Sequence, residues 1–222
     1  MRPMSIRTTR SEVLEATEHL PHEAILVVHG FEWDEYERLL DDLRDSRQLR
    51  VSYDSGRLRI MSISPEHEEY ATAIEGLILA FCDEAGITVE ARGCATWRRE
   101  TLARGVEADA CYYVQNAHRI IGKRQIDLID DPPPDLVVEV DLSAEVRHKF
   151  PIYAALGVSE VWQYDGETLQ FYRLRNDDYV SVAASEVLPA LSIDLLVEAM
   201  HVSKTEGQTA ARRHLRRKMH SR

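Results

Sequence analysis

The sequence contains few cysteines and no hydrophobic run of membrane-spanning length. Its three cysteines, Cys82, Cys94 and Cys111, are scattered, and an odd number without paired spacing indicates reduced thiols rather than disulfides. No two of them have the CxxC spacing, which argues against a structural zinc site. Because residues 1–7 also lack the apolar stretch of a secretory signal, we expect a cytoplasmic protein with no membrane partner.

The sequence also lacks internal repeats and low-complexity linkers. The 222 residues are 44% hydrophobic and 29% charged, which is typical of a soluble globular protein with a single core. We therefore predict one α+β domain over residues 24–202. An N-terminal arm, residues 1–23, precedes it, and a basic C-terminal tail, residues 203–222, follows it.

Acidic residues are almost missing from the C-terminal segment. Residues 203–222 carry seven Lys and Arg side chains against one Glu, a net charge of +6, whereas the whole chain carries −11, so residues 1–202 carry −17. A basic tail on an acidic body could contact nucleic acid. Charge blocks at chain ends are more often solvated, so we expect a partly disordered tail that complements its own acidic domain.

Hydrophobic spacing and turn signals predict helices and strands along the whole domain. The clearest helix starts at Ser64-Pro65, with Ser as N-cap and Pro at the first helical position, and stops at Gly86. The other predicted helices cover 33–43, 151–156 and 193–200. The predicted strands cover 24–29, 49–53, 57–63, 87–91, 94–97, 106–114, 135–142, 158–164 and 168–174.

Two predicted strands carry acids where a sheet normally has apolar residues. Glu107 and Asp109 alternate in the strand 106–114, and Glu139 and Asp141 alternate in the next. Alternate residues share a face, so up to four carboxylates would meet if the strands were neighbours. Buried carboxylates would repel one another and stay protonated unless a cation lay among them, which suggests a metal-dependent catalytic centre.

The alternative is that these acids lie on the solvent face of a half-exposed sheet, as is normal for antiparallel strands. Against this, the residues around Glu139 are mostly Leu and Val, which indicates a covered central strand. Lys149 follows downstream and could stabilise charge on a group under attack. His67, in the first turn of the helix after Ser64, could be a hydrogen-bonding partner of the acids or a base, although a histidine there is more often a surface or capping residue.

Four segments in this order resemble the Uma2 family of restriction-endonuclease-like proteins, and the resemblance runs from about residue 27 to residue 174. Its most specific parts are the runs PDLVVEV and YAALGVSEVW. The four segments are SPEHEEY at 64–70, VEAD at 106–109, PPDLVVEV at 133–140 and IYAALGVSEVW at 152–162.

The resemblance implies a restriction-endonuclease-like, PD-(D/E)xK core: a mixed central β-sheet flanked by helices, here with an additional N-terminal β-hairpin. In that fold two acids bind a divalent metal, Mg²⁺ or Mn²⁺, and Asp109 and Glu139 match them. The helix after Ser64 would supply a further acid, for which Glu68 is the nearest fit, with Glu75 on the same helical flank.

The sequence departs from the family pattern at two positions. Ala108 stands where the family usually has Pro, which should affect backbone stiffness more than chemistry. The lysine expected two residues after Glu139 is replaced by Asp141. Lys149 is the best substitute, and Arg147 is the runner-up.

These observations lead to a first hypothesis of a Mg²⁺-dependent endonuclease that hydrolyses DNA phosphodiester bonds. A homodimer is plausible because cutting both strands needs two centres. The second hypothesis is a catalytically inactive nuclease-like scaffold that binds nucleic acid or protein, which the acidic net charge and the displaced lysine favour. A third class, a toxin- or transposon-linked accessory protein, is left open by the sequence.

Overall fold

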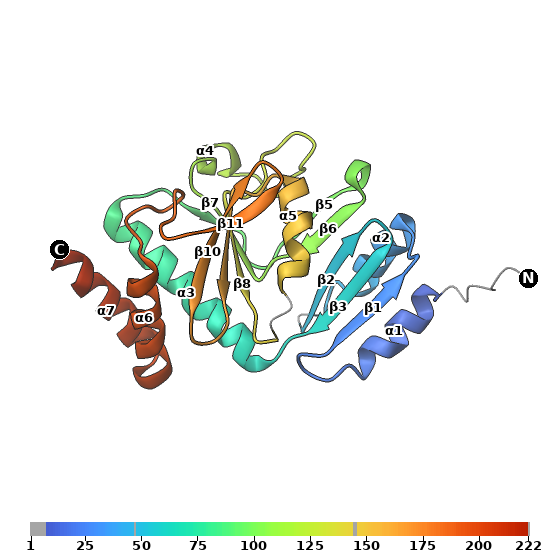
Figure 1. Ribbon diagram of the computed structural model, residues 1–222, viewed down its shortest axis with the longest axis horizontal. Coiled ribbons are helices and arrows are strands. Elements are labelled where there is room, and N and C mark those ends of the chain that lie inside the picture. Colours follow the sequence, from blue (N-terminus) through green and yellow to red (C-terminus); the bar gives the residue numbers. More distant parts are fainter. Residues whose placement is uncertain (1–7, 47, 144–145, 222) are drawn as a thin grey trace, which may run out of the picture.

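Two β-sheets lie beside each other in the computed structural model, which describes residues 8–46, 48–143 and 146–221 (Figure 1). The first sheet has the order β1-β3-β2-β6-β5, and its paired strands are all antiparallel. The second has the order β11-β10-β9-β8-β7-β4 and is mixed, because β8 and β9 are parallel and the other pairs are antiparallel. This confirms the predicted fold, a mixed sheet flanked by helices.

The first sheet contains the predicted N-terminal hairpin and packs against two helices. Val13 of α1 and Leu39 of α2 are buried in one core with residues of β2 and β3. The hairpin turns at Ser55 and Gly56, which both have positive φ, as a tight type I′ turn requires. The elements of this part are α1 (Arg10–Glu18), β1 (Ile25–His29), α2 (Trp33–Asp42), β2 (Leu49–Asp54), β3 (Arg57–Ser62), β5 (Thr96–Arg99), η1 (Glu100–Leu102) and β6 (Arg104–Glu107).

The second sheet is covered on both faces. The long helix α3 (Pro65–Ala85) and α6 (Ile193–Glu206) share one core with it, and α5 (Phe150–Leu156) packs into a second core with β7 and β8. The last strand of this sheet, β11, was not predicted. The remaining elements are β4 (Glu90–Ala91), β7 (Ala110–Tyr113), α4 (Ala117–Ile120), β8 (Leu136–Val140), η2 (Val146–Lys149), β9 (Glu160–Tyr164), β10 (Leu169–Arg175) and β11 (Asp178–Val182).

Helix α3 begins and ends where the sequence predicts. The Ser64 hydroxyl accepts a hydrogen bond from the backbone N–H of His67, and Pro65 occupies the first helical position. Gly86 ends the helix in the left-handed conformation, with φ of 65°. The N-terminal turn of α3 lies near the junction of the two sheets (Figure 1).

The predicted strand 106–114 is wrong as a single element. It divides into β6, in the first sheet, and β7, in the second. Ala108 and Asp109 form the crossing between the sheets, and the N–H of Ala108 donates to the backbone oxygen of Ala95, the residue before β5. Glu107 and Asp109 therefore do not alternate on one continuous strand.

The C-terminal segment is helical rather than a partly disordered tail, so that prediction is also wrong. Helix α6 continues to Glu206, and α7 (Gln208–His220) follows after Gly207. Ala211 and Leu215 of α7 are buried in the core that α3 shares. Residue 222 of this segment and residues 1–7 of the predicted N-terminal arm lie outside the described residues. Throughout the described ranges, the structure contains no helix that is both long and apolar enough to span a membrane.

Candidate active site

Asp109 is buried where the chain crosses between the sheets, and three groups hold its carboxylate. Arg50 Nε donates to Oδ1 at 3.0 Å, and the backbone N–H of Val140 donates to Oδ2 at 2.9 Å. His67 Nε2 lies 3.2 Å from Oδ2. Through the hydrogen bond from Val140, the carboxylate of Asp109 is joined directly to β8, the strand that carries Glu139.

The surroundings of Asp109 favour its charged form. Burial alone would raise the pKa of Asp109, but the contact with His67 and the positive charges of Lys149, His67 and Arg50 outweigh burial and hold the pKa well below its usual range. Burial likewise opposes charge on His67, yet its contact with Asp109 raises the pKa of the imidazole. Both ring nitrogens of His67 are buried and neither meets hydrogen-bond geometry within the described residues, so the contact of Nε2 with Asp109 is electrostatic.

Besides Tyr153 on α5, the sequence reasoning missed Arg50 as a site residue. It lies on β2 and is 4% exposed. Its Nη2 also donates to Glu68 Oε2 at 3.0 Å, so the guanidinium bridges Glu68 on α3 to Asp109. The sequence gives no signal for this role, because Arg50 alternates with apolar residues as an exposed arginine on a half-buried strand does.

Glu139 lies on β8, fully buried, and different groups hold its two oxygens. Lys149 Nζ donates to Oε2 at 2.6 Å, and the Tyr153 hydroxyl donates to Oε1. Burial raises the pKa of Glu139 to about 7; the negative charge of Asp109 adds to this effect, while Lys149 and Tyr153 oppose it. Lys149 Nζ also donates to the backbone oxygen of Glu107 at 3.1 Å.

Asp141 stands two residues after Glu139, at the position where the family usually has lysine, and it holds the start of η2 by hydrogen bonds. Its Oδ2 accepts from the backbone N–H of Val146 at 3.1 Å and from Gln163 Nε2 at 2.6 Å. Val146 opens η2, which runs directly into α5. Lys149 and Tyr153 are four residues apart, so they extend from the same side of this segment toward Glu139.

The two predicted acids, Asp109 and Glu139, lie next to each other. Ala110 pairs with Val138 in the antiparallel ladder of β7 and β8, and the next position along it places Asp109 beside Glu139. The positive charge of Lys149 acts on both carboxylates. The structure therefore gathers Asp109, Glu139 and Lys149 in one buried cluster.

The other candidate residues face elsewhere. The Glu107 carboxylate accepts from the Val51 N–H at 2.7 Å and from Thr96 Oγ1 at 3.1 Å, both in the first sheet. Four carboxylates therefore do not converge as the alternating pattern predicted. Glu75 lies two turns beyond Glu68 on α3.

Arg147, the alternative to Lys149, points away from the carboxylates. Its guanidinium lies over the ring of Tyr172, 5.9 Å from the centroid, and Nη2 donates to the Tyr172 hydroxyl at 3.3 Å. Between the two basic candidates, the structure brings only Lys149 to Glu139.

The donor set suits magnesium by its chemistry. Among the described residues, no group of three or more His, Cys, Asp or Glu side chains is arranged to hold a metal ion. Magnesium, however, keeps several waters and needs only one or two carboxylates. The neighbouring carboxylates of Asp109 and Glu139 supply oxygen ligands of this kind.

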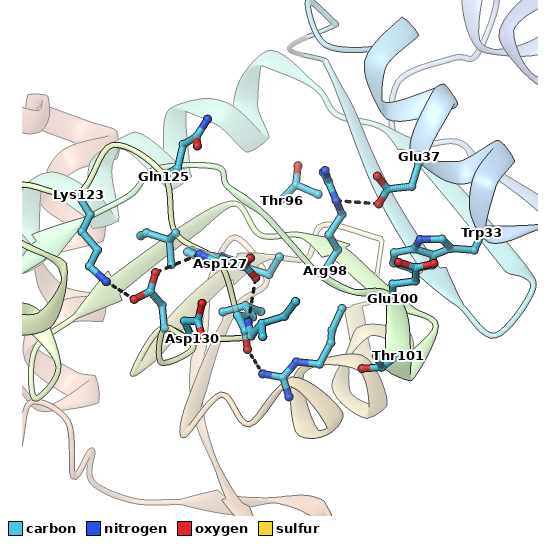
Figure 2. Close-up of a pocket in the computed structure, with 16 residues that line it drawn as sticks. Trp33, Glu37, Thr96, Arg98, Glu100, Thr101, Lys123, Gln125, Asp127 and Asp130 are labelled. Carbon is cyan, nitrogen blue, oxygen red and sulfur yellow. Dashed lines mark hydrogen bonds and ion pairs between the residues drawn. The ribbon is translucent and has the colours of Figure 1, made fainter.

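A large cavity lies apart from this cluster. It measures about 800 Å³ and lies between α2, β5 and the segment 123–131 (Figure 2). Two charge pairs lie in its lining, Arg98 with Glu37 and Lys123 with Asp131. Arg98 and Lys123 are about half exposed, whereas Asp109 and Glu139 are buried side by side, so the buried acids are the better candidate site.

A smaller cavity borders the acidic cluster itself. It measures about 300 Å³, and its lining includes Arg44, Arg50 and Glu107. Arg50 thus both lines this cavity and contacts the Asp109 carboxylate.

Comparison with known proteins supports a nuclease-like assignment. The sequence model of the Uma2 family, described as "Putative restriction endonuclease", matches residues 33–203. Among solved structures, a protein described as a "putative nuclease belonging to DUF820" from Anabaena variabilis ATCC 29413 is similar, with a TM-score of 0.50 and 16% identity over 87% of this chain and 99% of that chain. At this identity the likeness shows the fold alone. No curated protein matches the sequence.

Proposed function

Since the chain belongs to the Uma2 family, we propose that it is a metal-dependent endonuclease acting on DNA, with its catalytic centre at Asp109 and Glu139. The family description supports a nuclease-like function. The observation that carries the finer proposal is the buried cluster in which Lys149 Nζ lies 2.6 Å from Glu139, beside Asp109. Two acids and a lysine in contact match the chemistry of phosphodiester hydrolysis.

Each residue of the cluster would have a distinct part. Asp109 and Glu139 would hold Mg²⁺, which when bound activates water and screens the scissile phosphate. Lys149 would stabilise the charge that develops on that phosphate. Tyr153 fixes the orientation of Glu139 through one oxygen, and His67 helps to keep Asp109 ionised.

Helix α7 supports a nucleic-acid substrate. Its side chains that face the body pair with acids there: Arg216 with Glu84, and Lys218 with Glu198. Two further arginines, one helical turn apart at 213 and 217, are exposed and unpaired within the described part of the chain. Because the protein as a whole is acidic, a local basic surface of this kind is what contact with a phosphate backbone would require.

The direct test is plasmid cleavage with Mg²⁺ or Mn²⁺. We expect the wild type to nick or linearise the plasmid and Asp109→Ala and Glu139→Ala to leave it intact. Equal cleavage by all three proteins would reveal a contaminant and remove the proposed centre. If two copies act together on a duplex, linear product should rise more steeply with protein concentration than nicked product does.

The contribution of α7 is measured through the salt dependence of binding. In a non-cleaving Asp109→Asn background, replacing Arg213 and Arg217 with Ser should reduce the slope of log K against log[salt] by roughly two, about one per lost phosphate contact. A control pair, Arg38→Ser with Arg57→Ser, removes the same charge from exposed sites on the first sheet and its helix α2. Equal slopes for the two double variants would exclude α7 as the contact surface.

The alternative function is a nuclease-like scaffold without catalysis. Two observations favour it: Asp141 stands two residues after Glu139, and Arg50 already neutralises Asp109. Calorimetry with Mg²⁺ or Mn²⁺ separates the two functions. Binding that Glu139→Ala abolishes supports the enzyme, and an absence of binding at millimolar metal supports the scaffold.

A further inference from the structure

Arg50 reaches the candidate centre from outside the six-stranded sheet. It belongs to β2 of the first sheet, whereas Asp109, Glu139 and Lys149 lie on or directly beside the strands and helices of the second. Its guanidinium nevertheless contacts Asp109 at 3.0 Å and is almost completely buried. The N-terminal sheet thus places a fixed positive charge directly on one of the two acids.

We propose that Arg50 is a built-in competitor of the catalytic metal, and that the N-terminal sheet sets the metal affinity of the centre through it. This inference rests on the proposed function, because it concerns the same Asp109 carboxylate. It assigns to the first sheet a regulatory part in the site rather than a purely structural one.

Competition follows from the charges. A divalent cation and a guanidinium are both attracted to a buried carboxylate, and they repel each other strongly where water is scarce. An arginine cannot relieve this repulsion by losing its proton, since it stays charged in proteins. A cation that binds Asp109 must therefore displace Arg50 or tolerate its charge, and either lowers the affinity.

Arg50 also has a second partner, Glu68, which would hold the guanidinium after a metal ion displaced it from Asp109. Its Nη2 is bound to Glu68, whose side chain is 55% exposed, whereas the side chain of Asp109 is fully buried. The guanidinium is therefore anchored at both a buried and a solvent-facing acid. Releasing the buried contact would leave the ion pair with Glu68 in place.

The test is the Mn²⁺ affinity of the full chain, measured by calorimetry on wild type and Arg50→Gln. We expect the Kd to fall by roughly tenfold or more when the positive charge is removed. The matched control is Arg44→Gln, because Arg44 lines the same 300 Å³ cavity but is 73% exposed and pairs with Asp41. That variant should stay within about twofold of wild type, since exposed charges are screened.

A second variant separates charge from packing. Arg50→Lys keeps the charge and loses the forked contact, so its Kd should remain nearer to wild type than that of Arg50→Gln. Circular dichroism and urea unfolding confirm that each variant is folded at the assay temperature. The inference is overturned if the Kd of Arg50→Gln for Mn²⁺ is unchanged or higher than that of wild type. It is also overturned if Arg50→Lys gains as much Mn²⁺ affinity as Arg50→Gln.

Failure of this inference is distinguishable from failure of the proposed function. If wild type cleaves DNA, Asp109→Ala does not, and Arg50→Gln binds Mn²⁺ no more tightly, only the competitor role falls. If neither wild type nor Arg50→Gln binds Mn²⁺, the competitor role falls together with the metal centre. Binding by Arg50→Gln alone supports the competitor role.

Discussion

The two halves of the candidate centre hold their acids in opposite ways. The Asp109 half receives contacts from three separate elements: Arg50 on β2, His67 on α3 and the backbone of Val140 on β8. The Glu139 half is served by one short segment, which supplies a lysine and a tyrosine hydroxyl four residues apart.

Burial alone does not explain the difference, because both carboxylates are inaccessible to solvent. The pKa of Asp109 is held low by its donors and by the surrounding positive charges, although burial opposes this. The pKa of Glu139 is raised to about 7 because burial and the charge of Asp109 outweigh its lysine and tyrosine. The comparison shows that the partners of a buried acid decide whether it is permanently charged or titrates near neutral pH.

Removing Lys149, the one cation that contacts Glu139 among the described residues, should have the largest effect. We expect Lys149→Met to lower the single-turnover cleavage rate by roughly 100- to 1000-fold, because the charge on the phosphate loses its stabilising partner. The control is Lys123→Met, which removes an equal charge at the rim of the 800 Å³ cavity. If Lys149→Met lowered the cleavage rate by less than about threefold, cleavage would not depend on this lysine.

The pKa values of Glu139 and Asp109 are shifted in opposite directions, so the free energy of unfolding should change with pH in opposite ways for the two acids. Glu139 has a folded-state pKa of about 7, above the ordinary 4.5, so the folded state holds its proton more tightly. This stabilisation is complete below about pH 4.5 and is lost as pH rises through about 7, a decrease of up to about 3 kcal/mol. Asp109 acts in reverse, since its lowered pKa stabilises the fold above about pH 4, and that stabilisation is lost in acid.

Urea unfolding of metal-free protein between pH 5 and pH 8 measures the Glu139 effect. Glu139→Gln cannot titrate at this position, so its free energy of unfolding should lack the decrease that wild type shows. If the free energy of unfolding changed equally with pH in both proteins, the pKa of Glu139 would not be raised in the folded state. The contrast with Asp109 would then disappear.

The smallest effect is expected from the tyrosine. Tyr153→Phe removes one neutral donor to Glu139 and should lower the free energy of unfolding by about 1–2 kcal/mol. It should also move the pH profile of cleavage upward, because the ionised carboxylate loses a hydrogen bond. Tyr113→Phe is the control, since its hydroxyl donates to the Pro132 carbonyl instead of to Glu139. An equal pH profile for both variants would argue against an orienting role for Tyr153.

Elements with local signals were predictable from the sequence, and elements defined by their partners were not. Ser64, Pro65 and Gly86 fix the ends of α3 through contacts within a few residues, so its bounds follow from the sequence. The stretch 106–114 has strand-like residues throughout, and only its two different partners, β2 and β8, divide it. The packing of α7 was missed for a related reason, because its dense positive charge outweighed the apolar pair at Ala211 and Leu215.

The sequence by itself determined the mixed fold, through strand and helix periodicity and the resemblance, and it singled out Asp109, Glu139 and Lys149. Only the tertiary structure decided what surrounds them. Arg50 is 59 residues from Asp109 in the chain, and their contact exists because β2 and the crossing at Asp109 meet at the junction of the two sheets. Periodicity tells which face of an element is buried, but not which distant charge will be buried against it.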